Sequence, residues 1–447
     1  MSRSLTIECE WIDQPAAVDP VERRTWASLR IQAAGRFVTR FRDRATEDER
    51  TLLFVPVFPV ARWLVQNWWN LLLEPKPSEE LAPYTSMRSP ERRMWIERHC
   101  LRAAESGLLL PRMFLFGDGA KVCLQWMADG ESEYPHMPGF FVGDGLAAVD
   151  RSELEVTLHD FISQVLARLN GANDPRIAAL RSNWKAISEA DAEERAFCLA
   201  AGRMGLDPYS ADDWAPELTE LFESGFGDDV EKPLVTDFLE VAEASQAPAT
   251  WRWVSEAERS LHMRGASSAT SKWQTDAYQV AAEEGYRLAR QLREEAGVQS
   301  GRVDVGSVAE KLGLGRLALE VRNHVPSGQI KAAVGWRDGR EPVVAGPEPA
   351  SQGGRRFLEA RGLFHAMFAC ARGPRLITGA HTWDQQASRA FAAELLAPRT
   401  DLLKQYRTES GSRDFDLMVS EMAAEYGVSA KVIEHQFENA GVCPLAE

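Results

Sequence analysis

Two stretches decide the fold of the C-terminal part of this 447-residue chain: R-F-L-E-A-R-G-L-F-H at positions 356–365 and S-R-A-F-A-A-E-L-L-A-P at positions 388–398. Their apolar residues recur three and four positions apart, which is the spacing of an amphipathic helix. We therefore expect helices over Arg356–Cys370 and Asp384–Leu396, and Pro398 should stop the second one.

The sequence on either side of these helices favours a mostly helical domain with a small antiparallel sheet. Ala332–Trp336 and Pro342–Ala345 are strand-like and flank R-D-G-R at positions 337–340, which is typical of a hairpin turn. Apolar spacing predicts four further helices in this part of the chain: Tyr278–Ala296, Val305–Leu314, Leu417–Tyr426 and Ala430–Asn439.

This order of elements resembles the ImmA/IrrE zinc metallopeptidases of bacteria and their mobile elements. Positions 356–365 resemble the family's R-F-x-x-A-H-E-L-G-H helix, and positions 388–398 resemble its A-N-x-F-A-A-x-L-L-M-P helix. The resemblance implies a peptidase-like domain over residues 272–447. It does not extend to residues 1–271.

A zinc peptidase of this kind needs two His four residues apart, a Glu beside the first as general base, and a third ligand from a later helix. The resemblance places Arg361 at the first His position, Gly362 at the base position, His365 at the second His position and Gln385 at the third ligand. A guanidinium stays protonated and glycine has no proton acceptor. We therefore expect a degenerate domain with no catalytic residue and no cofactor.

The same residues allow two alternative structures for this site. In one, a rearranged zinc site forms from His365, His381 and Asp384, and the chain is a zinc metallo-endopeptidase. In the other, Arg361 takes the structural place of the metal and pairs with Asp384 or Glu394 across the two helices. The plainer interpretation, which we favour over a rearranged zinc site, is a half-buried His365, a loop His381 and a solvent-facing Asp384.

Basic residues are frequent around the two quoted stretches. A basic face could form around the cleft from five arginines: Arg355, Arg356, Arg361, Arg372 and Arg375. An ordinary solvated helix surface explains the same residues, and we favour that interpretation slightly.

The last two predicted helices have helix-turn-helix spacing, with G-V-S at positions 427–429 between them. A DNA-binding regulator would read bases with side chains of the second helix, namely Lys431, His435 and Gln436. The same helix carries Glu434 and Glu438, which disfavour contact with phosphates. A packed helical pair is therefore the favoured interpretation.

The remaining sequence predicts two further domains. Residues 1–149 alternate strand-like and helix-like segments and favour a small α+β domain, with hairpins around Ala33–Arg36 and Gly117–Gly119. We expect the tryptophans at 63, 68 and 69 in its core. Residues 150–265 favour a helical domain, and G-A-S-S-A-T-S at positions 265–271 is typical of a linker. The fold class predicted for the whole chain is thus α+β and mostly helical.

The composition argues against several classes of function. The net charge of −15 makes nucleic acid an improbable partner for the whole chain. The six Cys are scattered and form no CxxC pair, so the sequence suggests neither a zinc ribbon nor a dithiol redox site. The N-terminal sequence is not typical of a secretory signal, and no apolar segment is long enough to span a membrane, so a cytoplasmic protein is predicted. The leading hypothesis is a non-catalytic protein that binds a protein partner or ligand; the sequence indicates neither that partner nor the oligomeric state.

Overall fold

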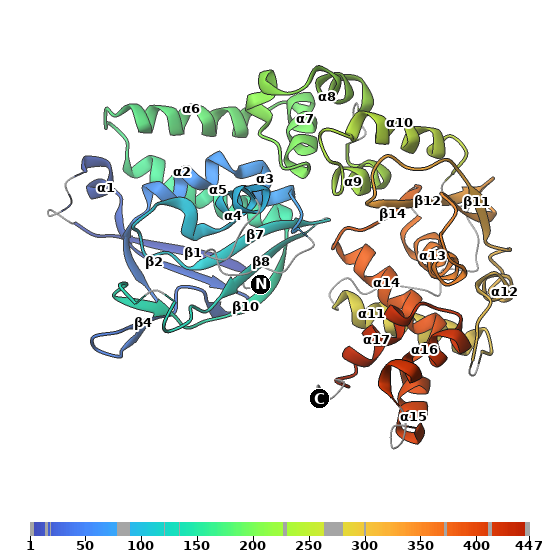
Figure 1. The fold of residues 1–447 in the computed structure, drawn as a ribbon. Coiled ribbons are helices and arrows are strands. Elements are labelled where there is room, and N and C mark those ends of the chain that lie inside the picture. The colour runs from blue at the N-terminus through green and yellow to red at the C-terminus, as the bar shows by residue number, and fades with distance from the viewer. Residues whose placement is uncertain are drawn as a thin grey trace. The chain divides into compact units, whose positions relative to one another are not determined.

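The computed structural model describes residues 4–13, 17, 19–77, 90–119, 121–133, 135–226, 230–262, 280–298, 301–370, 373–409 and 414–442. The chain forms two compact units, Met1–Trp214 and Ala215–Glu447 (Figure 1). Their boundary falls inside the region 150–265, so the helices predicted there are shared between the two units. The α+β, mostly helical fold class is confirmed. The linker predicted at Gly265–Ser271 lies outside the described residues.

The first unit combines short antiparallel sheets with helices. Its strands are β1 (Leu5–Trp11), β2 (Trp26–Ala33), β3 (Arg36–Phe37), β4 (Phe41–Asp43), β5 (Glu49–Arg50), β6 (Leu53–Pro56), β7 (Arg112–Asp118), β8 (Lys121–Met127), β9 (Gly139–Phe141) and β10 (Gly145–Asp150). Its α-helices are α1 (Pro20–Arg24), α2 (Phe58–Gln66), α3 (Trp68–Leu73), α4 (Pro90–His99), α5 (Arg151–Arg168), α6 (Pro175–Glu189) and α7 (Ala192–Arg203).

Both predicted hairpins are present in this unit, although the second is displaced. In the first, Gln32 pairs with Phe37 and Ala33 with Arg36, so the chain turns where the sequence predicts. In the second, pairing between β7 and β8 continues to Asp118 and Lys121, so Gly117 and Asp118 belong to the strand and only Gly119 of the predicted turn lies in the turn. The three tryptophans Trp63, Trp68 and Trp69 are buried, as expected for core residues.

The second unit holds the two quoted stretches. Its strands are β11 (Ala318–Val321), β12 (Ile330–Arg337), β13 (Glu341–Gly346) and β14 (Arg375–Thr378). Its α-helices are α8 (Pro216–Leu221), α9 (Pro233–Leu239), α10 (Ala247–Glu258), α11 (Ala281–Glu295), α12 (Val305–Lys311), α13 (Gln352–Phe364), α14 (Trp383–Leu396), α15 (Arg399–Glu409), α16 (Phe415–Tyr426) and α17 (Ala430–Glu438).

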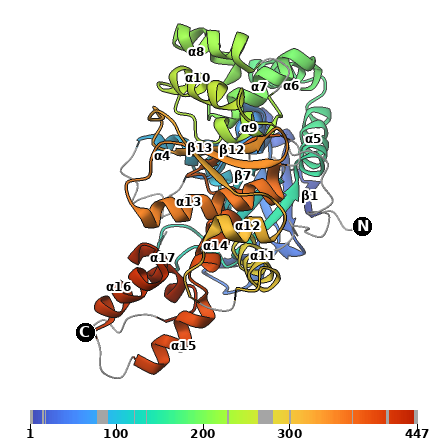
Figure 2. The ribbon, with the colours of Figure 1, turned by 90° about the vertical axis from the view of Figure 1, so that its right-hand side faces the viewer.

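The four strands of this unit form one sheet in the order β11-β13-β12-β14. The predicted hairpin joins β12 and β13, and β14 pairs antiparallel with β12. The sheet is not purely antiparallel as predicted, because β11 runs parallel to β13. Figures 1 and 2 show α9 and α10 on one side of the sheet and α11, α13 and α14 on the other.

Close packing between α11 and α14 fixes the position of the second quoted stretch. A Cβ atom at Gly285 of α11 would lie 2.3 Å from the backbone oxygen of Ala387 on α14, so only glycine permits this approach. Phe364, Phe391 and Leu395 are fully buried in the core between these helices and the sheet. Within the described residues, no helix has both the length and the apolar character needed to cross a membrane.

Candidate functional site

The two quoted stretches lie side by side as α13 and α14, and their polar positions face each other. Ser351 caps α13 by accepting a hydrogen bond from the Gly354 amide, and a π-helical segment, His365–Ala369, continues the helix beyond Phe364. Arg361 and His365 are four residues apart and therefore share a face. Gln385 of α14 lies against that face. The structure thus brings together three of the positions that the resemblance assigns to one site.

Arg361 occupies the centre of this site and is held by neutral groups. Its Nε donates to Ser388 Oγ at 3.1 Å, and its Nη2 donates to Gln385 Oε1 at 2.6 Å and to the Thr378 carbonyl at 3.0 Å. The residue is only 6% exposed. Burial, and to a lesser extent the charge of the nearby Arg389, lowers the pKa of Arg361 to about 9. A protonated guanidinium here repels any metal cation.

Gly362, at the position of the general base, is packed against the sheet. A Cβ atom on this residue would lie 2.2 Å from Val344 Cγ2 on β13. No side chain fits there unless Val344 moves, so the position lacks a proton acceptor and also the space for one.

His365 is fully buried, and neither of its ring nitrogens makes a hydrogen bond of normal geometry among the described residues, although the Gln385 side chain lies close enough to act on the ring. Burial lowers its pKa well below the usual range, and Arg375, Arg361 and Arg389 lower it further. The imidazole is therefore neutral near pH 7. An unpartnered polar ring at this depth is uncommon, because burying a polar group without a hydrogen bond destabilises the fold.

Gln385 joins Arg361 to the edge of the sheet. Its Nε2 donates to the Leu376 carbonyl at 2.8 Å, and its Oε1 accepts from the Thr378 amide at 3.0 Å. The side-chain amide of Gln385 thus makes the two backbone hydrogen bonds that a neighbouring strand would make at the outer edge of β14. The Leu376 amide donates to Asp237 of α9 at 2.8 Å, which satisfies the next backbone group along this edge.

Asp384 does not reach Arg361, and the predicted pairing between them is wrong. Its carboxylate lies 2.8 Å from Arg375 Nη2, and the same guanidinium is bound by Asp237 at 2.7 and 2.8 Å. Burial by itself lowers the pKa of Arg375, but the carboxylates of Asp237 and Asp384 raise it well above its usual range. Asp384 therefore stabilises a neighbouring ion pair.

Glu394 likewise does not contact Arg361. Its buried carboxylate accepts from Arg290 Nε at 2.9 Å, from the Arg399 amide at 3.2 Å and from Gln436 Nε2 at 3.1 Å. It holds α11, α14, α15 and α17 together and is a structural residue. The proposed bridge across α13 and α14 does exist, but neutral groups of α14 make it.

The candidates for a rearranged zinc site do not converge. His381 is exposed, His365 is fully buried, and Asp384 is bound to Arg375. Among the described residues, no three His, Cys, Asp or Glu side chains lie close enough together to hold a metal ion. The residues at this site therefore do not fit zinc.

The predicted basic face is not a solvent-facing surface, although Arg355 is exposed. Arg361 is buried, Arg375 is mostly covered by its two carboxylate partners, and Arg356 donates to the carbonyls of Val303, Tyr426 and Gly427. Arg372 lies outside the described residues.

The C-terminal pair α16 and α17 forms as predicted, and its packing opposes the DNA-binding alternative. Gln436, one of the predicted base-reading residues, is buried against Glu394 and the Ala397 carbonyl. His435 lies 2.8 Å from Glu438, which adds negative charge to the exposed side of α17.

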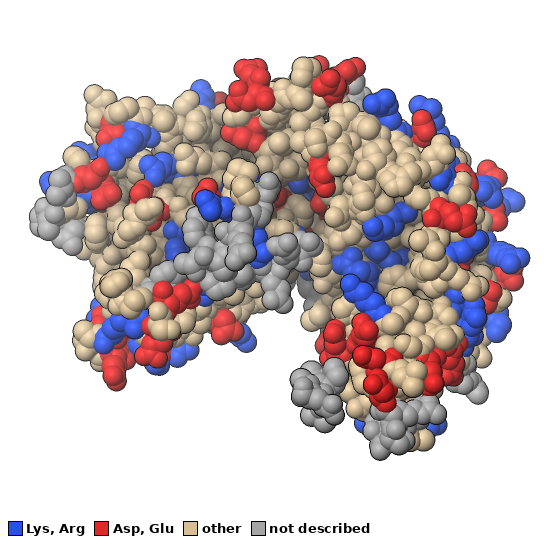
Figure 3. Space-filling model, viewed as in Figure 1, with Lys and Arg blue, Asp and Glu red and all other residues tan. Residues whose placement is uncertain are grey.

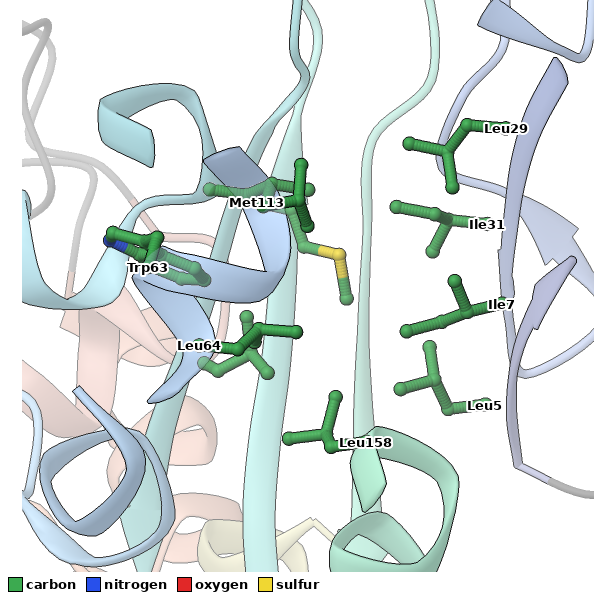
Figure 4. Close-up of a pocket in the computed structure, with 11 residues that line it drawn as sticks. Leu5, Ile7, Leu29, Ile31, Trp63, Leu64, Met113 and Leu158 are labelled. Carbon is green, nitrogen blue, oxygen red and sulfur yellow. The ribbon is translucent and has the colours of Figure 1, made fainter. Parts of the chain in front are cut away.

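The first unit contains two features that the sequence did not indicate. A small cavity near α2 is lined by apolar side chains, among them Ile31, Trp63 and Met113 (Figure 4). It offers no polar group to a ligand. The buried Glu74 carboxylate accepts from Arg98 at 2.6 and 3.0 Å and lies 2.9 Å from His99 Nε2.

No model of a known protein family matches the chain, and a search of curated protein sequences found no significant match. Any functional conclusion therefore depends on the residues of the site.

The sequence placed Arg361, His365 and Gln385 together but did not indicate Ser388, Thr378 and Asp237. Ser388 lies inside the second quoted stretch and one turn after Gln385, and this spacing could have revealed it.

Proposed function

We propose that this chain is a catalytically degenerate ImmA/IrrE-like protein that acts by binding a protein or ligand and does not cleave peptides. The observation that supports this proposal is the place of Arg361, whose guanidinium bonds Gln385, Ser388 and Thr378 where the family would hold zinc. The family resemblance suggests a setting in bacterial stress response, repressor control or conflict with mobile elements. That setting rests on association with the family alone.

Catalysis would require more than a restored metal. Metal-assisted hydrolysis needs a base to take the proton from the metal-bound water, and Gly362 cannot act as that base. Its contact with Val344 also excludes a simple replacement by Glu. A binding role needs only the folded helices, and hydrogen bonds across α13 and α14 already stabilise them.

The zinc content of the purified full-length protein tests this proposal. We expect protein without stoichiometric zinc, whose stability does not change with a chelator. The matched variant combines Arg361→His with Gln385→Glu, which restores two ligands beside His365. It should acquire about one zinc per chain but no peptidase activity, because position 362 is unchanged.

The opposite result would be stoichiometric zinc in the unmodified protein that is lost in both His365→Ala and His381→Ala. Such a result would establish a rearranged metal site and overturn the proposal. The exposed Arg407→Gln variant controls for nonspecific effects of removing an arginine from this unit.

A further inference from the structure

The charges around the candidate site are not balanced. Within the described ranges, Arg361 has no carboxylate among its partners, and its hydrogen bonds use only Nε and Nη2. Its Nη1 has no partner among the described residues. A buried cation is ordinarily paired with an anion, because neutral partners compensate only part of its lost hydration.

Arg389 adds a second uncompensated cation. It follows Ser388 on α14, lies one turn after Gln385, and is half-buried. In the described part of the chain it makes neither a hydrogen bond nor an ion pair. It lies near enough to Arg361 to affect the ionisation of that residue. The two guanidiniums therefore repel each other with no described carboxylate between them.

His365 provides a third group, whose ring nitrogens make no hydrogen bond of normal geometry among the described residues. Its ring is fully buried beside Gln385, and the positive charges of Arg375, Arg361 and Arg389 act on it. A neutral imidazole can donate one N–H to a ligand. Lys and Arg side chains also gather over α14 on the face of the molecule that Figure 3 shows, with Asp and Glu side chains beside them toward the C-terminal helices. The positive potential of this surface favours the approach of an anion.

We propose that Arg361, Arg389 and His365 form a binding site for an oxyanion, a carboxylate or phosphate group, at the position where a zinc peptidase holds its metal. Arg361 Nη1 and the Arg389 fork supply charge-assisted donors, and His365 supplies a neutral one. The half-buried Arg389 forms the outer side of this site. The inference rests on the proposed function, since it names the ligand chemistry of the same non-catalytic site.

Phosphate and acetate are the probes that test this inference. The full chain is titrated with sodium phosphate or sodium acetate at constant ionic strength, and binding is followed by calorimetry and by the midpoint of thermal unfolding. We expect saturable binding of at least one of the two anions. Arg389→Gln should weaken it by about tenfold or more, as expected for a lost charge-assisted contact, whereas Arg389→Lys should weaken it less. Arg407→Gln removes the same charge from exposed α15 and should not change it.

Phosphate also stabilises proteins without binding to a site, but that effect does not saturate and would be equal in all variants. An equal, unsaturable response in the unmodified protein and in Arg389→Gln would overturn the inference. Tighter binding of acetate would identify a carboxylate as the preferred ligand, and tighter binding of phosphate a phosphate group. Because Arg361→Gln removes core hydrogen bonds and could prevent folding, the conclusion rests on the Arg389 variants.

Zinc analysis of the same preparation separates the two hypotheses. Stoichiometric zinc would contradict the proposed function. Metal-free protein without saturable anion binding would contradict this inference alone.

Discussion

Arg361 is a buried arginine and Arg375 a mostly buried one of the same unit, and their surroundings differ. Arg375 is bound by the carboxylates of Asp237 and Asp384, and its charge is compensated within the fold. Arg361 is bound by a hydroxyl, an amide and a carbonyl, and its charge remains uncompensated. The comparison shows that two arginines removed from most of the solvent can serve different purposes. A paired arginine fastens α9 to β14, whereas an unpaired one keeps its charge available to a ligand.

The largest expected loss of stability comes from breaking the ion pairs of Arg375. Asp237→Ala leaves Arg375 with only the partly exposed Asp384 and removes the acceptor of the Leu376 amide. We expect the free energy of unfolding to fall by about 3–5 kcal/mol, as for other broken buried ion pairs. Urea unfolding measures this loss. Asp384→Asn, the control at the more exposed partner, should cost about 1 kcal/mol or less.

In the first unit, the buried Glu74 is a carboxylate whose charge is compensated by Arg98 and His99. Burial by itself raises the pKa of Glu74, but His99 and Arg98 lower it below its usual range. A carboxyl whose pKa is lowered on folding stabilises the protein above its unfolded-state pKa, and that contribution is lost as the pH falls through the folded-state pKa.

Glu74→Gln should therefore reduce the free energy of unfolding at pH 7 by about 2–3 kcal/mol, the range for hydrogen bonds to charged groups. The difference from the unmodified protein should shrink below about pH 4, where the unfolded-state carboxyl becomes protonated. Urea unfolding between pH 3 and pH 7 checks this. A difference that is independent of pH would show that the ion pairs contribute nothing.

Arg361→Met tests the neutral site directly. The substitution leaves Thr378 and Gln385 oxygens without one donor each but also removes a buried charge. These effects oppose each other, so we expect a loss of about 1–3 kcal/mol in unfolding free energy. A loss equal to that of Asp237→Ala, measured in the same urea series, would remove the distinction between the two arginines.

Gln385→Glu would make the Arg361 site resemble the Arg375 site. The new carboxylate compensates the guanidinium, although the donor to the Leu376 carbonyl is lost. We expect a change in stability within about 1 kcal/mol, because buried ion pairs contribute little net stability over neutral alternatives. Anion titration gives the decisive readout: saturable binding should disappear. Binding of unchanged affinity would show that compensation of Arg361 is irrelevant.

Local sequence pattern predicted the helices and hairpins that surround the site. α13, α14, α16 and α17 have apolar residues at helical spacing, and the β12–β13 hairpin has a clear turn sequence. The sequence interpretation omitted β14, whose four residues are too few to show a pattern.

Contacts between distant residues were harder to predict. The spacing of Arg361 and His365 placed both on one helix face, but nothing near Asp237 indicated that it would bind Arg375. Likewise, the sequence suggested a carboxylate for Arg361, and the structure instead provides Gln385 and Ser388. Charge complementarity alone could not make this choice, because helix crossing determines which side chains meet.

The side chains along the edge of β14 also affect how its backbone exchanges hydrogen with solvent. The amide protons of Leu376 and Thr378 are bonded to Asp237 and Gln385, so they should exchange with deuterium slowly although no described strand covers this outer edge of β14. Asp237→Ala should accelerate exchange at Leu376 more than at Thr378. Exchange rates at these two amides would therefore report separately on the contact with α9 and on the contact with α14.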